Sequence, residues 1–148
     1  MIGEKIMSRK TAREVAFKII FASNFQNEEI TPEDMLDALL KETENHDDVN
    51  SEDMNYVKDV VHGVYANMDK LDDLIKEHLK GWTMDRICKT DLAILRLAIY
   101  EILHRDDIPY KVTVNEAVEL AKSFSEDNSP SFVNGILAEI INAEGMNE

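Results

Sequence analysis

Apolar residues recur at steps of three and four along most of the chain, which is the spacing of a helix with one buried face. Over about residues 9–25 this pattern predicts a first helix that packs on a core. The residues of its apolar stripe are Ala12, Val15, Ala16, Ile19 and Ser23. Another face of the same helix carries Arg9, Arg13 and Phe17, each four residues after the last, so both arginines are expected on one side of the helix.

Four later positions carry the signals of a helix start. These are TPED at residues 31–34, Ser51, the capping-box pattern TVNE at residues 113–116, and Ser-Pro at residues 129–130. Each is followed by apolar residues at helical spacing. The four helices predicted from them cover residues 31–40, 51–65, 113–124 and 129–141. A further apolar pattern predicts a helix over residues 71–79 that stops at Gly81.

Residues 91–103, with the sequence DLAILRLAIYEIL, are apolar on nearly every side of a helix. Only Arg96 and Glu101 interrupt the pattern after the first residue. A helix without a polar face has to be covered all round, so it is expected at the centre of a bundle. It is too short to span a membrane.

The predicted fold class is therefore all-α, a compact bundle of about six or seven helices. No stretch alternates apolar and polar residues well enough to predict a strand. We expect a single domain over residues 1–148, and a division into two helical subdomains near residues 42–50 or at Gly81 stays open.

Charge is distributed unevenly along the chain. The whole sequence has 16 basic and 30 acidic side chains, a formal net charge of −14. The first 20 residues nevertheless carry five basic and two acidic side chains, whereas residues 21–57 carry one basic and eleven acidic. An acidic average favours solubility and opposes general binding to nucleic acid. The basic start is thus a local feature that needs its own explanation.

Several classes of function find no support in the sequence. Cys88 is the only cysteine, so the chain has neither an internal disulfide nor a cysteine-based zinc site, and a reduced cytoplasm is expected. No membrane span and no leader segment are predicted. A glycine-rich phosphate loop, a GxSxG elbow and an HExxH pattern are all absent. We therefore expect no enzyme activity, no metal and no cofactor.

The basic start is a candidate site for single-stranded RNA. Arg9, Lys10 and Arg13 lie near a helix start, where unpaired backbone N–H groups add positive potential. A second candidate set lies between the last two helices: Lys122, Phe124, Asn128 and Ser129. Basic side chains beside an aromatic ring are typical of single-strand RNA sites. Alternatively, the basic cluster is ordinary solvated surface and Phe124 belongs to the core.

Three stretches resemble the NusB family of bacterial transcription antitermination factors. The first is SRKTARE at residues 8–14, similar to an arginine-rich motif of that family, although Thr11 stands where some members have a basic residue. The second is DLAILRLAIYEILHRDDIPY at residues 91–110. The third lies within residues 114–135 and contains NEA, ELAK and FVNG blocks.

This resemblance implies an all-helical RNA-binding protein that pairs with ribosomal protein S10. The pair would recognise a short single-stranded boxA element in nascent RNA and act within the RNA polymerase antitermination complex, notably on ribosomal RNA operons. Carried over to this sequence, the basic positions are Arg9, Lys10 and Arg13. The second RNA-contacting region would contain Lys122, Phe124, Asn128 and Ser129.

Two other functions remain as alternatives. One is a fragment resembling the RNA-binding domain of a ribosomal RNA cytosine methyltransferase, which would require a catalytic part outside these 148 residues. The other is a helical protein-interaction module without RNA binding. Whether the free protein forms a homodimer that covers the basic edge is also left open by the sequence.

Overall fold

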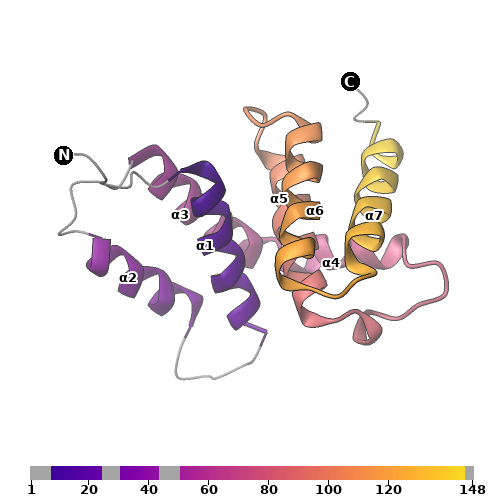
Figure 1. Ribbon diagram of the computed structural model, residues 1–148, viewed down its shortest axis with the longest axis horizontal. Helices are drawn as coiled ribbons and strands as arrows, with labels where there is room; N and C mark the ends of the chain where they lie inside the picture. The colour runs from indigo at the N-terminus through magenta and orange to yellow at the C-terminus, as the bar shows by residue number, and fades with distance from the viewer. Residues whose placement is uncertain (1–7, 25–30, 44–50, 146–148) are drawn as a thin grey trace.

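The computed structural model describes residues 8–24, 31–43 and 51–145, and this part of the chain is helical with no strand. Seven α-helices and one short 3-10 helix follow one another (Figure 1). They are α1 (Arg9–Ala22), α2 (Pro32–Thr43), α3 (Ser51–Ala66), α4 (Met68–Glu77), η1 (Met84–Arg86), α5 (Lys89–His104), α6 (Tyr110–Phe124) and α7 (Ser129–Ala143). The all-α prediction is confirmed.

Helix α5 is the central element, as its sequence predicts. It contacts α1, α3, α4, α6 and α7, and Ile94, Leu95, Leu97 and Ile99 are almost completely buried. Burying each such side chain contributes about 1.5–3 kcal/mol to folding. Because other helices surround α5, the contacts of its side chains determine how the outer helices are positioned.

Helices α1 and α6 both pack on α5, and these two carry most of the candidate site. Helix α1 also packs on α3, whereas α6 packs on α7. Figure 1 shows α1, α2 and α3 on one side of the molecule and α6 with α7 on the other, with α5 behind α6. The seam between α1 and α6 therefore joins the start of the described chain to its last third.

The predicted start of α2 is confirmed in atomic detail. The backbone N–H of Asp34 donates to Thr31 Oγ1 at 3.1 Å, and the backbone N–H of Thr31 donates to Asp34 Oδ2 at 3.0 Å. This reciprocal pair satisfies two groups that the first turn leaves without a helical partner. The predicted extent of the linker over residues 42–50 lies mostly outside the described residues, because 44–50 are not among them.

The predicted start of α6 at Thr113 is wrong, since the helix begins at Tyr110 with Pro109 as its N-cap. The carbonyl oxygen of Pro109 already accepts from the backbone N–H of Thr113 at 3.2 Å. Thr113 is thus inside the first turn, and its buried hydroxyl bonds to Glu101 instead of capping the helix. The Glu101 carboxylate on the preceding helix, α5, therefore accepts from the hydroxyl that the local pattern would use as a cap.

The other helix ends differ by a few residues from their predicted positions. Helix α4 ends at Glu77, ahead of the predicted stop at Gly81, and the turn that follows places Lys80 at φ 43° and Gly81 at φ 90°. Glycine is suited to such a left-handed turn. Helix α7 has Asn128 as its N-cap, so Ser129 is already helical.

Candidate nucleic-acid interface

Helix α1 begins with a positive end. Ser8 is its N-cap, and Ser8 Oγ accepts a hydrogen bond from the backbone N–H of Thr11 at 3.0 Å. Arg9 and Lys10 are the first two helical residues, and the first turn contains no acidic residue. The partial positive charge of the helix start and the two cations therefore act at the same place.

Arg13, one turn further along α1, is buried with only 4% of its surface exposed. Its Nε–H donates to Glu101 Oε2 at 2.8 Å, and its Nη2 donates to Glu101 Oε1 at 3.2 Å. Arg9 and Arg13 lie on one side of α1 as predicted, since both guanidinium groups lie against the Tyr56 ring, but Arg13 does not reach the surface as a direct RNA contact requires. The reason is that a buried carboxylate on α5 needs a cationic partner, and α1 supplies it at this position.

Glu101 is the centre of a buried polar cluster. Besides Arg13, it accepts hydrogen bonds from the Tyr56 hydroxyl and from Thr113 Oγ1, the latter at 2.9 Å. Residues of α1, α3, α5 and α6 thus meet at one carboxylate. Burial, followed by the negative charge of Glu101, raises the pKa of Tyr56. Burial also lowers the pKa of Arg13, but the hydrogen bond to Glu101 and nearby negative charge more than offset this, so its pKa is raised.

Arg9 and Lys10 remain at the surface. Arg9 is partly exposed; its Nε–H donates to Asp53 Oδ1 at 3.0 Å, and its guanidinium carbon lies 4.6 Å from the centre of the Tyr56 ring. The guanidinium is thereby held against α3. Lys10 is exposed, and no ion pair joins it to any residue in the described part of the chain. Lys10 is accordingly the cation that is most available to a phosphate.

The second predicted set divides between surface and interior. Lys122 and Asn128 are exposed, whereas Ser129 is buried and its hydroxyl donates to Asp91 Oδ2 at 2.9 Å. Direct contact with RNA would require an exposed Ser129 hydroxyl, but in the structure this hydroxyl is buried. The cause is the N-terminal end of α5, where Asp91 draws in hydroxyl donors from the turn between α6 and α7.

Phe124 is both a packing residue and a surface residue. Its ring centre lies 5.3 Å from that of Phe17, and 39% of the residue is exposed. Neither the core alternative nor full exposure describes it. An aromatic ring that packs on a neighbouring ring and is still partly exposed provides a platform on which a base can stack.

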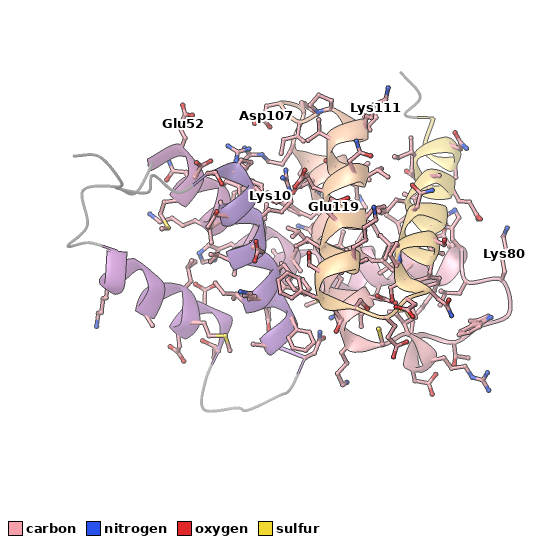
Figure 2. The ribbon with its side chains drawn as sticks, viewed as in Figure 1. Lys10, Glu52, Lys80, Asp107, Lys111 and Glu119 are labelled. Carbon is pink, nitrogen blue, oxygen red and sulfur yellow. The ribbon has the colours of Figure 1, made fainter. Side chains whose placement is uncertain are left out.

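A groove along the seam between α1 and α6 connects the two predicted sets. It is lined by Lys10, Arg13, Glu14, Glu116, Glu119, Leu120, Ser123 and Phe124. Figure 2 shows Lys10 and Glu119 on facing helices across this seam. The structure thus brings Lys10 and Phe124 together. Asn128 instead lines a separate groove of about 350 Å³ beside Trp82 and Phe132.

Lys18 belongs to this surface, although the sequence analysis did not select it. It is exposed on α1, and its Nζ lies 5.4 Å from the centre of the Phe124 ring. Lys10, Glu14 and Lys18 follow one another at four-residue spacing, which places them along one face of the helix. The four-residue spacing from Lys10 was the feature of the sequence that could have identified Lys18.

Neither a metal site nor a membrane span is found in the parts of the chain that the structure describes. No group of three or more His, Cys, Asp or Glu side chains there could hold a metal ion. No helix among residues 8–24, 31–43 and 51–145 has the length and apolar character needed to cross a bilayer.

Comparison with known proteins identifies the family of this chain. A model described as the NusB family matches residues 10–142. The transcription antitermination protein NusB of Acetivibrio thermocellus is 45% identical over 140 residues, covering 95% of this chain and 92% of that protein.

Solved structures are also similar. T. maritima NusB has a TM-score of 0.82 and 34% identity, covering 93% of this chain and 92% of that one. The fold is also shared, with a TM-score of 0.78, 24% identity and coverage of 91% and 96%, by a crystal structure described as antitermination factors NusB and NusE in complex with dsRNA. The family match across most of the chain and the 45% identity over almost its whole length show that this chain belongs to the NusB family.

Proposed function

We propose that the protein is a transcription antitermination factor that binds boxA RNA together with ribosomal protein S10. Its role would be to support processive transcription of ribosomal RNA operons within the RNA polymerase antitermination complex, in the cytoplasm and without catalysing a reaction. Membership of the NusB family supports this proposal, as does the similar protein of A. thermocellus, which is named a transcription antitermination protein.

The observation that carries the proposal is the surface on which Lys10, Lys18 and Phe124 lie together. Lys10 and Phe124 line the groove between α1 and α6, and Lys18 lies over the Phe124 ring. Lysine side chains attract phosphates, and an exposed ring stacks on an unpaired base. The combination suits a single strand, because bases within a duplex are not free to stack on a protein ring.

The predicted residues fall into two groups, those that contact RNA directly and those that hold a helix or turn in place. We propose that Arg9, Lys10, Lys18, Lys122 and Phe124 contact RNA directly, and that Asn128 adds a contact from the separate groove that it lines. Arg13 and Ser129 would act indirectly. Arg13 fixes α1 through Glu101, and Ser129 fixes the turn between α6 and α7 through Asp91.

A binding titration tests this function. Fluorescence anisotropy would follow a labelled boxA RNA and a scrambled RNA of equal length, each with and without S10. We expect boxA RNA to bind more tightly than scrambled RNA, and S10 to increase the affinity severalfold. Equal affinity for both RNAs in the presence of S10 would contradict the proposal and favour a protein-interaction module without RNA binding.

A further inference from the structure

Most basic side chains around the groove between α1 and α6 already have an acidic partner. Among the described residues, these ion pairs are Arg9–Asp53 at 3.0 Å, Arg13–Glu101 at 2.8 Å, Arg13–Glu116 at 3.8 Å, Lys18–Glu14 at 3.9 Å and Lys122–Glu119 at 3.3 Å. Lys10 is the exception at this surface. The basic surface is therefore largely neutralised from within the protein before any RNA arrives.

Of these five acidic partners, Glu116 pairs with Arg13, which Glu101 already holds, and the other four are of two kinds. Asp53 and Glu101 are buried, and their ion pairs hold helices together. Glu14 and Glu119, in contrast, have side chains that are 37% and 49% exposed and line the groove itself. Exposed ion pairs contribute little to stability. The fold therefore does not depend on these two carboxylates, and their main effect is on the charge of the groove.

A carboxylate that is paired with a lysine competes with an RNA phosphate for that lysine. When a free lysine neutralises a phosphate, the RNA releases a condensed counterion, and binding weakens as salt rises. When the lysine must first leave a glutamate, the exposed carboxylate takes up a cation from solution. The net release of ions is then smaller, and so is the gain in affinity.

We propose that Glu14 and Glu119 act as an internal electrostatic brake on phosphate binding. They occupy Lys18 and Lys122 in the free protein and thereby lower its affinity for every RNA that offers only a backbone. Tight binding then requires contacts beyond phosphate, from base stacking on Phe124 or from a partner protein. Glu14 and Glu119 thereby limit how much affinity phosphate contacts alone can provide, and the inference rests on the proposed function.

The test uses the full chain carrying E14Q together with E119Q. Glutamine keeps the shape of the side chain and removes its charge. The matched control is D73N with E77Q, which removes two charges from exposed positions on α4, a helix that packs on α3 and α5. Affinity for boxA RNA and for scrambled RNA is measured over a range of salt concentrations, and circular dichroism checks that both variants remain helical.

We expect E14Q/E119Q to bind both RNAs about two- to tenfold more tightly than the unchanged protein. The salt dependence should also steepen, by up to about 0.7 per released lysine in the slope of log affinity against log salt. An equal gain in D73N/E77Q would show an effect of net charge alone and overturn the brake, as would unchanged affinity in E14Q/E119Q. Failure of the proposed function is distinct, because it appears as equal binding of boxA and scrambled RNA by the unchanged protein with S10.

Discussion

Arg13 on α1 and Glu101 on α5 form a buried bidentate ion pair at the point where four helices meet. Tyr56 and Thr113 add hydrogen bonds to the same carboxylate. The basic stretch that opens the described chain thus serves two purposes. One arginine fixes the helix in place, and its neighbours remain at the surface where a phosphate can reach them.

Arg13→Ala should destabilise the fold by about 3–5 kcal/mol, because it leaves a buried carboxylate without its cation. Urea denaturation followed by circular dichroism would measure the loss. Arg9→Ala is the comparison variant. It also leaves a carboxylate, Asp53, without its cation, but Arg9 is partly exposed, so water can replace it and we expect a smaller loss of about 1 kcal/mol. If Arg13→Ala proved as stable as the unchanged protein, the polar cluster would not hold α1 in place.

This prediction also changes how RNA-binding variants should be designed. A double variant of Arg9 and Arg13 removes a surface cation through its first change but a core ion pair through its second. Any fall in RNA affinity would then combine lost contacts with lost structure. Single changes at Lys10, Lys18 or Phe124 avoid this problem, because these side chains are exposed.

The fold could be predicted from the sequence wherever local pattern and burial agree. Residues 91–103 are the best example, since an apolar sequence on every face has to be central. Thr113 shows where local reasoning fails. Residues 113–116 do have the capping-box sequence, but the Thr113 hydroxyl donates to Glu101 on α5 instead of capping α6. Only the packing of α6 on α5 reveals that choice.

The candidate site was predictable in part. Lys10 and Lys122 are both exposed, as lysine side chains generally are. Arg13 and Ser129 could not be placed from sequence, because their burial depends on carboxylates at positions 101 and 91. Those acids lie in the same apolar helix, and a buried acid always needs donors. That requirement was a usable signal, but it did not identify the donors.

Lys10→Ala should lower affinity for boxA RNA without changing stability, since Lys10 has no ion pair to lose within the described residues. The slope of log affinity against log salt should fall by up to about 0.7. Fluorescence anisotropy at several salt concentrations measures both quantities. Lys70→Ala, an exposed change on α4, is the charge-matched control and should leave the slope unchanged. A fall of the same size in both variants would contradict a local role for Lys10.

Phe124→Leu should weaken binding of boxA RNA and leave the salt dependence unchanged, because it removes a stacking surface and no charge. Stacking of a base on an aromatic ring is worth about 1–3 kcal/mol. Leucine keeps the apolar contact with Phe17, so only a small loss of stability is expected. A changed salt slope with unchanged affinity at low salt would argue that Phe124 does not stack on RNA.

Gly63 and Gly135 should respond in opposite ways to alanine. A Cβ at Gly63 would lie 2.1 Å from ring atoms of Tyr100, so α3 and α5 would have to separate or the ring would have to move. We expect a loss of about 1–3 kcal/mol in the free energy of unfolding. No atom lies within 4 Å of a Cβ at Gly135 on α7, where alanine should add about 0.5–1 kcal/mol. Thermal unfolding of the two variants checks both signs.

Tyr100 makes the fold sensitive to alkaline pH. Burial, followed by the hydrogen bond to Asp59, raises the pKa of Tyr100 from 10.0 to about 12. Folding therefore favours the neutral phenol. The stability that this provides is complete below pH 10 and is lost as the pH rises from 10 to about 12, where the unfolded chain has released the proton and the folded chain has not.

Urea denaturation at about pH 9 and about pH 11 would measure this loss, and Tyr100→Phe provides the control. The variant lacks the hydroxyl that donates to Asp59 at 2.7 Å, so it should start from a lower stability at the lower pH. It should then lose less between the two pH values, because it has one ionisable phenol fewer. Part of the loss should persist, since the pKa of the buried Tyr56 is also raised, by burial and by Glu101. Equal losses in the variant and the unchanged protein would show that Tyr100 ionises as freely in the folded chain as in the unfolded one.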